Sequence, residues 1–442
     1  MKRILTISLI GLTVALFPPR MEAQVWTLEQ AVAFALEKSP DSRIANHRIR
    51  SAEATVRQAK SGLYPRVDLR ASYMQTNTPM MAFGAILNQG VFDFGLDFND
   101  PGRVDNLNLT GLVGYNIYSG GKRSAGQDAA DAGLRASELD SQSVRDQLAY
   151  EVVNAYFNII KAREVVASTE TAVAAFEENL KVAKLKFEAG TFLKTEVLNL
   201  EVQLAQTREN HLGFSHQRDL AERVFLNLLG LDSGQGVTLA PDDQTIDLLR
   251  PPPSVDLSTH PDLLSMKART EAAEAQVRMA KGDRMPIVNA FGSYQLDHGW
   301  RLDGTGDSWM AGVSVDFNIF DGAMTREKIH EAEARHAVTL EGLRKMTLGI
   351  DLQVEQAKLA LAQTIQRLEV TKKVIEQAEE SAVLSRARFE QGVILSSDLI
   401  NIETSLTRAR MRRAIAIADE RVAVAQLRRA LGLQQFPNPS SI

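Results

Sequence analysis

The residues that most suggest chemistry in this sequence are His330, Glu331 and His336, because imidazole and carboxylate groups bind metals and move protons. On a helix, residues six positions apart lie about 120° out of line. A zinc-binding H-E-x-x-H pair shares one helix face instead. We therefore interpret the two histidines as solvated helix surface, and we expect neither a metal nor a cofactor.

The rest of the sequence shows no recognisable catalytic pattern. The chain has no cysteine, which excludes disulfides, thiolate metal sites and a lipidated N-terminal cysteine. It contains neither a phosphate-binding glycine-rich loop nor a G-x-S-x-G turn, and no carboxylate pair stands out among 55 acidic residues. We predict that the chain is not an enzyme. A formal net charge of −5 without a basic domain argues against nucleic acid as a partner.

One basic run does stand out in a predicted helix. It consists of Arg408, Arg410, Arg412 and Arg413, and only Arg208 matches it in the first half of the chain. Such a run is usually a solvated helix face, and contact with acidic groups of a partner is the alternative.

The N-terminus indicates export. Lys2 and Arg3 precede an apolar stretch at 4–17 that is too short to span a bilayer, which is typical of a signal peptide covering residues 1–23. No later stretch approaches the 18 apolar residues that a transmembrane helix needs.

The chain is internally duplicated. Residues 40–73 match residues 261–294 at 14 of 34 positions, an offset of 221, and the match resumes from Asn116 with an offset of 202. We place the first repeat at 24–232, a connector at 233–259, the second repeat at 260–433 and a tail at 434–442. Three prolines at 251–253 favour an extended connector.

Each repeat reads as a helix, two strands, one very long helix and another helix. In the long helices, apolar residues recur every three or four positions over 144–187 and again over 346–389, which predicts left-handed coiled-coil packing. The first of them is nearly 70 residues and therefore about 100 Å long. Shorter partners are expected at roughly 40–62 and 195–229. The predicted fold class is mostly α with a small β part.

The predicted strands alternate apolar and polar residues. Val67, Leu69, Ala71 and Tyr73 lie on one face of the first, and 308–319 follows the same pattern. This pattern is typical of a transmembrane β-strand, although a half-buried strand of a soluble protein looks the same. Four strands cannot close a membrane barrel. If the strands cross the membrane, the barrel must therefore be shared between chains.

The first repeat holds about 19 extra residues between its strands. This segment, 77–106, joins the strand ends that lead away from the helices, so we expect it at the extracellular mouth. It contains four phenylalanines, and we expect it to fold inward or against its symmetry mates. They are Phe83, Phe92, Phe94 and Phe98.

Several short motifs, in order, resemble the TolC-like outer membrane efflux family over essentially the whole mature chain. They are Trp26-Thr27-Leu28-Glu29-Gln30-Ala31 with Pro40, Pro65, Ser119-Gly120-Gly121, Asp321-Gly322, the duplicated Phe-Glu-x-Gly turn, and Leu-Gly-Leu at the end of each half. The resemblance implies a homotrimer in the outer membrane, with a shared twelve-stranded β-barrel and a coiled-coil α-helical barrel in the periplasm. It also implies contact with outer membrane lipid, a periplasmic adaptor protein and an inner-membrane pump.

In that family the turns at 188–196 and 390–398, here named the first tip and the second tip, are the periplasmic ends. The resemblance implies adaptor docking at Gly190 and Thr191 and at Gly392 and Val393. A glycine that serves only as a helix C-cap is the alternative.

The family also carries two aspartates after the second tip that ring the tunnel's constriction. Asp398 stands at the first of these positions, and the second is Asn401, a departure from the pattern. Alternatively, Asp398 caps its helix, a role for which Ser396 and Ser397 compete.

Two classes of function follow. The first is a passive outer membrane channel of a tripartite export system, and the second is an exported coiled-coil structural or adhesion protein without a pore. Detergent-dependent extraction from the outer membrane separates them. The exported substrate does not follow from this sequence.

Overall fold

The computed structural model describes residues 25–240, 250–252 and 255–436. The predicted signal peptide and parts of the connector and tail lie outside these residues. The chain divides into two units. Unit 1 comprises 1–39, 151–250 and 364–424, and unit 2 comprises 40–150, 251–363 and 425–442. The long helices pass from one unit into the other.

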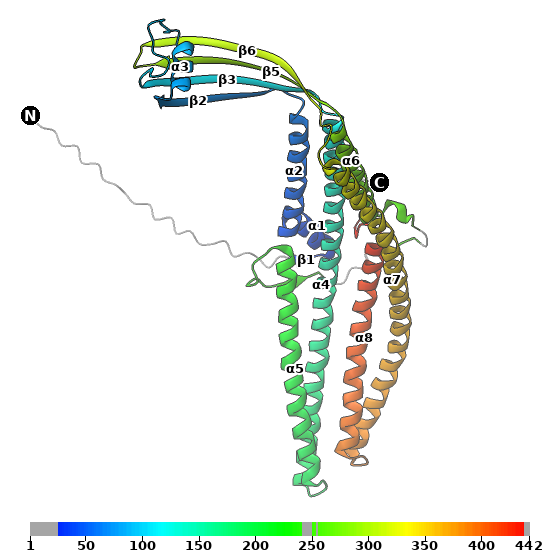
Figure 1. The fold of residues 1–442 in the computed structure, drawn as a ribbon. Coiled ribbons are helices and arrows are strands. Elements are labelled where there is room, and N and C mark those ends of the chain that lie inside the picture. The colour runs from blue at the N-terminus through cyan, green and yellow to red at the C-terminus, as the bar shows by residue number, and fades with distance from the viewer. Residues whose placement is uncertain (1–24, 241–249, 253–254, 437–442) are drawn as a thin grey trace, which may run out of the picture. The chain divides into compact units, whose positions relative to one another are not determined.

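Each half contains a helix, two strands, one very long helix and another helix in that order, and the first half has two additional short helices (Figure 1). The helices of the first half are α1 (Leu28–Lys38), α2 (Pro40–Ser61), α3 (Pro79–Asn88), α4 (Lys122–Glu188) and α5 (Lys194–Leu229). Those of the second half are α6 (Pro261–Lys281), α7 (Met324–Gln391) and α8 (Ser396–Ala430), with short 3₁₀ turns at Leu257–Thr259 and Gly282–Arg284. None of the helices in the described ranges is long and apolar enough to cross a membrane.

Unit 2 contains an antiparallel sheet of four strands in the order β2-β3-β5-β6. The strands are β2 (Arg66–Thr76), β3 (Val104–Tyr118), β5 (Ile287–Gly299) and β6 (Gly304–Asp316). β6 ends three residues before the predicted end at 319, because its last partner is Ile287, the first residue of β5. β2 and β6 are the outer strands, and each has one unpaired edge within the described chain.

Helix α3 is the element that the sequence did not predict. It lies within the inserted segment, and its residues Ala82, Ala85 and Ile86 pack against Val104 of β3 at the far end of the sheet. Gln89 follows α3 and donates from Nε2 to the carbonyl oxygen of Asp105 at 2.7 Å.

The phenylalanines of the inserted segment stack on one another. Phe83 lies edge-on to Phe98 with ring centroids 4.9 Å apart and to Phe92 at 5.7 Å. Phe94 remains 93 % exposed. Whether the segment folds inward in an assembly stays a prediction.

Ion pairs and an apolar core bind the helices of unit 2 together. Arg278 of α6 pairs with Asp128 of α4 at 2.9 Å, and Arg135 of α4 pairs with Glu271 of α6. Leu263, Ile350 and Leu427 are buried in a core that joins α6, α7 and the end of α8.

Unit 1 is built on the coiled-coil halves of α4, α5, α7 and α8, which run side by side in Figure 1. Arg163 of α4 pairs with Glu222 of α5 at 2.7 Å, and Lys161 of α4 lies 3.9 Å from Asp419 of α8. The N-terminus of α1 is fixed by a capping box, in which the Gln30 amide donates to Thr27 Oγ1 at 3.2 Å. Beside it, β1 (Val25–Trp26) pairs in parallel with β4 (Thr238–Leu239).

Candidate functional site

The first tip is shaped by a glycine-terminated helix end. Gly190 has φ of 76°, a left-handed conformation that glycine adopts without a Cβ penalty. Its amide donates to the Phe187 carbonyl at 2.9 Å, and the Thr191 amide donates to the Lys186 carbonyl at 2.9 Å. These two hydrogen bonds form a Schellman motif, which satisfies the last carbonyls of α4.

The second tip repeats this geometry. Gly392 has φ of 79°, its amide donates to the Phe389 carbonyl at 2.9 Å, and the Val393 amide donates to the Arg388 carbonyl at 2.9 Å. Both glycines are therefore helix C-caps, as the alternative interpretation holds. All four predicted docking residues are nevertheless exposed, so capping and docking are compatible roles.

The two tips contact each other inside unit 1. The ring of Phe192 from the first tip packs edge-on against Phe389, with centroids 5.3 Å apart. The Glu196 carboxylate of α5 accepts a hydrogen bond from the Ser396 amide, the first of α8, at 2.7 Å. A shared apolar core of Phe176, Leu200 and Leu399 lies above these contacts.

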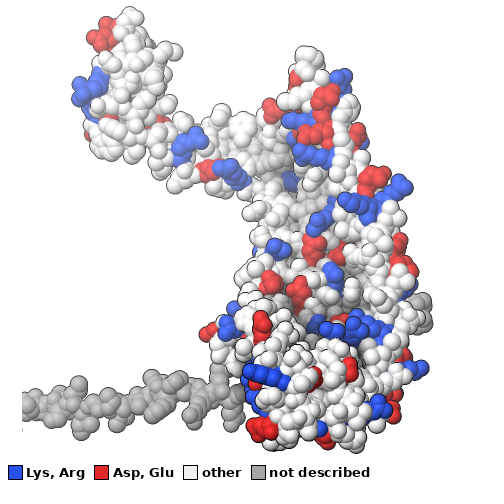
Figure 2. Space-filling model, turned by 90° about the horizontal axis from the view of Figure 1, so that it is seen from below, with Lys and Arg blue, Asp and Glu red and all other residues white. Residues whose placement is uncertain are grey.

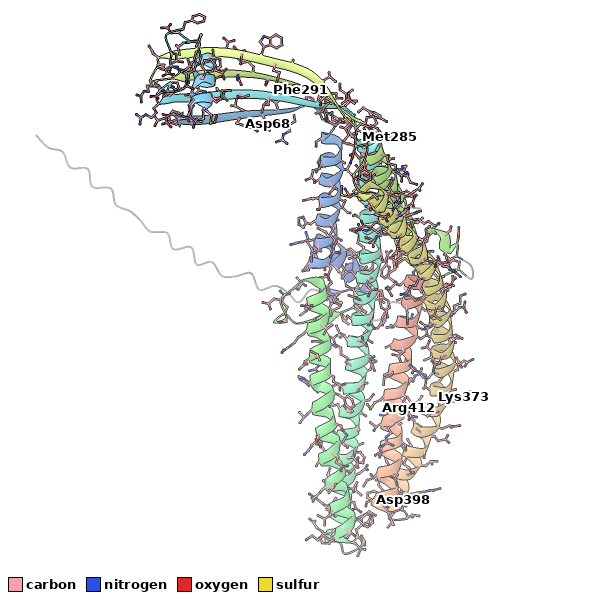
Figure 3. All side chains as sticks on the ribbon, viewed as in Figure 1. Asp68, Met285, Phe291, Lys373, Asp398 and Arg412 are labelled. Carbon is pink, nitrogen blue, oxygen red and sulfur yellow. The ribbon has the colours of Figure 1, made fainter. Side chains whose placement is uncertain are left out.

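Asp398 is exposed at the tip end of α8 (Figure 3). It is the third residue of the helix, so it does not occupy the N-cap position. The first amide of α8 is satisfied instead by Glu196 of the other half. Asn401 is also exposed and lies three residues further along α8, on the same face.

The hairpins α4–α5 and α7–α8 carry the same ion pairs, which the sequence analysis did not detect. The signal was available, because the charged residues recur at the 202-residue offset. The pairs are Lys184–Glu201 at 2.9 Å with its counterpart Arg386–Glu403, and Glu177–Arg208 at 2.6 Å with its counterpart Glu379–Arg410 at 3.1 Å.

The basic run of α8 is divided among different environments. Arg410 pairs with Glu379, whereas Arg408 lines a cavity of about 360 Å³ between α4, α5 and α8. Arg412, labelled in Figure 3, and Arg413 form no ion pair within the described chain. Figure 2 shows charges of both signs interspersed over the viewed face, so no large basic patch gathers there.

His330 and His336 lie along α7. His330 is exposed, with Nδ1 3.2 Å from Glu327 Oε2 of the preceding turn. Within the described ranges, no three histidine or carboxylate side chains are grouped as metal ligands would be.

The sheet has one apolar face and one mainly polar face. The register aligns Leu69, Gly111 and Tyr294 with Trp309 across all four strands, and these residues share the first face. Val67 and Leu69 are 72 % and 76 % exposed, so this face is uncovered in the single chain. The opposite face includes Asp68, labelled in Figure 3, and Arg70.

Comparison with known proteins agrees with this architecture. Residues 32–231 and 253–433 match the outer membrane efflux protein family, one segment in each half of the chain. The chain belongs to this family.

Two relatives align with most of the length of this family member. Protein CyaE of Bordetella pertussis is 24% identical over 439 residues, which cover 94% of this chain and 86% of CyaE. The pyoverdine export outer membrane protein OpmQ of Pseudomonas aeruginosa is 24% identical, over 92% of this chain and 84% of OpmQ.

Solved structures share the fold. The outer membrane protein VceC from Vibrio cholerae has a TM-score of 0.77 at 19% identity, over 92% of this chain and 97% of VceC. CusC has a TM-score of 0.79 at 14% identity, over 92% of each chain.

Family membership confirms the predicted fold class, the predicted location in the outer membrane and the predicted function as an export channel. The alternative of an exported adhesion protein without a pore receives no support. The family is one of transport proteins.

Proposed function

We propose that three copies of this efflux family chain form one export channel, with a periplasmic adaptor at its tips and an inner-membrane pump behind the adaptor. The observation that carries this proposal is the sheet, which exposes an apolar face and leaves β2 and β6 with unpaired edges. Unpaired backbone groups are costly in lipid, so a membrane sheet closes into a barrel. Four strands are too few, and three copies supply twelve.

The assembly is tested by the mass of the detergent-purified protein. Native mass spectrometry or light scattering is expected to give a trimer. A monodisperse monomer that retains its secondary structure contradicts the shared barrel.

The tips are the proposed docking surface for the adaptor. Gly190, Thr191, Gly392 and Val393 are exposed, and they lie on turns that the Schellman motifs hold in a fixed shape. Val393→Asp is expected to abolish co-purification of the adaptor and to leave the trimer intact. Lys181→Asp, at an exposed α4 position before the tip, is the matched control and should retain the adaptor.

Asp398 and Asn401 are the proposed aperture residues. Three symmetry-related Asp398 carboxylates would concentrate cations at a narrow opening. Asp398→Asn is therefore expected to lower cation preference in planar-bilayer conductance, and Asp398→Arg to favour anions. Because Asn401 adds no second acidic ring, the single change should remove most of the selectivity. Unaltered selectivity in a folded Asp398→Arg trimer contradicts the aperture role.

A further inference from the structure

The two hairpins of unit 1 match in their side-chain contacts as well as in their sequence. Both ion pairs of α4–α5 recur in α7–α8 at an offset of 202, and both tips carry the same Schellman hydrogen bonds. A contact that one hairpin makes therefore predicts the contact that the equivalent residues of the other hairpin make when they meet a similar surface.

The contact used for this prediction is the one between the two tips within one chain. Glu196 of the first hairpin accepts a hydrogen bond from the first amide of α8, that of Ser396, at 2.7 Å. Phe192 of the first hairpin covers Phe389 of the second, which is only 1 % exposed.

The 202-residue offset assigns a counterpart to each member of this contact. Asp398 corresponds to Glu196, and Lys194 corresponds to Ser396 as the first residue of its helix. Ile394 corresponds to Phe192, and Phe187 corresponds to Phe389.

Three of these counterparts are unmatched in the single chain, whereas Ile394 is half-buried against the tip core of its own copy. Asp398 is exposed, and the Lys194 amide has no acceptor within the described ranges. Phe187 is 44 % exposed, although its counterpart Phe389 is buried. Asp398, the Lys194 amide and Phe187 are therefore available to a second copy, and Ile394 keeps an exposed part.

A second copy of the chain supplies the surface that they meet. Within one copy the hairpins meet through α4 and α8, where Lys161 approaches Asp419, so α5 and α7 are the outer helices (Figure 1). The duplication relates α4 to α7 and α5 to α8. In a closed ring of copies, the α7–α8 hairpin of one copy therefore meets the α4–α5 hairpin of the next in the same way.

We propose that Asp398 of one copy accepts a hydrogen bond from the Lys194 amide of the next copy, while Ile394 packs on that copy's Phe187. This inference rests on the proposed oligomeric channel and names the residues that join its tips. A carboxylate at a helix N-terminus satisfies an orphan amide and is favoured by the helix dipole. Only one carboxylate oxygen is needed, which leaves the other for the aperture.

The position of the contact is tested by cross-linking, since the chain has no native cysteine. Phe187→Cys with Ile394→Cys, treated with a short bis-maleimide, is expected to give covalent dimers and trimers on a denaturing gel. Phe192→Cys with Phe389→Cys is the matched control and should give only an intrachain link. A trimer by native mass in which the first pair yields no interchain product overturns the inference. A wild-type chain that forms no trimer overturns the proposed channel instead.

The hydrogen bond is tested by removing its donor alone. Lys194→Pro deletes the amide at the first position of a helix, where proline is tolerated, and Leu193 before it is already extended with ψ of 152°. Lys194→Gln removes the charge and keeps the amide. Lys194→Pro and Asp398→Ala are each expected to accelerate dissociation of the trimer in denaturing detergent about tenfold, the effect of one hydrogen bond to a charged group.

A double variant decides whether the two groups act together. If they form one hydrogen bond, Lys194→Pro with Asp398→Ala dissociates no faster than either single variant. The assignment is overturned if the two increases in dissociation rate multiply in the double variant. It is also overturned if the Lys194→Gln trimer dissociates as fast as the Lys194→Pro trimer.

Discussion

Two equivalent ion pairs in this channel differ in burial, and burial decides what each contributes. The side chain of Glu403 is 4% exposed beside Arg386, whereas Lys184 and Glu201 are 51% and 42% exposed. The Glu403 partnership also raises the pKa of Arg386. Arg386→Ala would leave a buried carboxylate without its cation, which costs several kcal/mol when both groups are buried.

We expect Arg386→Ala to lower the free energy of unfolding by about 2 kcal/mol, because the guanidinium itself reaches water. The counterpart Lys184→Ala is expected to lower it by less than about 1 kcal/mol. Denaturant unfolding followed by circular dichroism measures both. Equal effects of the two variants contradict the role given to burial.

Asp146 of α4 gives the stability of unit 2 a dependence on pH. Burial raises the pKa of this carboxyl to about 6, and the nearby Asp262 raises it further, whereas Arg145 lowers it. One oxygen of this carboxylate is buried and has no hydrogen-bond partner among the described residues. A carboxyl whose pKa is higher in the folded than in the unfolded state destabilises the fold above that pKa. Stability is therefore gained as pH falls through about 6 toward the unfolded value of 3.8.

Asp146→Asn is expected to remove this penalty. At pH 7.5 it should increase the free energy of unfolding by about 1 kcal/mol, after allowance for screening at a partly exposed site. The gain should shrink as pH is lowered from 7.5 and vanish near pH 4. Thermal unfolding of both proteins across this range is the measurement, and a gain that does not depend on pH contradicts the assignment.

At the scale of the element, the ends of the long helices depend on backbone conformation. Gly190→Ala places a Cβ on a left-handed residue and is expected to cost about 1 kcal/mol, although no atom lies within 4 Å of that Cβ. Gly213 lies inside α5 with equally open surroundings and no left-handed φ. Gly213→Ala should stabilise the helix by about 0.5–1 kcal/mol. A lower melting temperature for Gly190→Ala and a higher one for Gly213→Ala support the helix-cap role of Gly190. A change in the same direction for both variants contradicts it.

The helices and strands with regularly spaced apolar residues were predictable from the sequence. Apolar residues at threes and fours over 144–187 and 346–389 predicted α4 and α7 and located their tip ends within a few residues, although both helices begin well before the pattern does. Coiled-coil packing imposes that spacing over many turns. The alternation around Val67 and Val313 located β2 and β6 in the same way.

Contacts between elements distant in the sequence were not predictable in this way. Nothing local to Glu196 shows that it caps a helix 200 residues later, and α3 has too few turns for a clear period. Asp398 was assigned a possible N-cap because aspartate is common there, but the helix begins two residues earlier. The structure leaves its predicted aperture role untested.

At the scale of the molecule, the direction of the strands predicts which parts of the chain face outside. The register pairs Thr76 with Val104 and Gly299 with Gly304 at one end of the sheet, so both hairpin connections lie there. At the other end, Arg66, Tyr118, Ile287 and Asp316 lead into helices. In an outer membrane channel with a periplasmic helical part, we therefore expect the hairpin end to be extracellular.

Labelling of single cysteines tests this direction, since the chain has none of its own. Asn88 is exposed at the end of α3 on the hairpin end, and Thr191 is exposed on the first tip. A membrane-impermeant maleimide added to intact cells is expected to label Asn88→Cys and to leave Thr191→Cys unmodified. After the outer membrane is permeabilised, both should react, because only the bilayer separates the reagent from the tips. Reaction of Thr191→Cys in intact cells, with Asn88→Cys protected, would reverse the orientation of the strands and place the tips outside the cell.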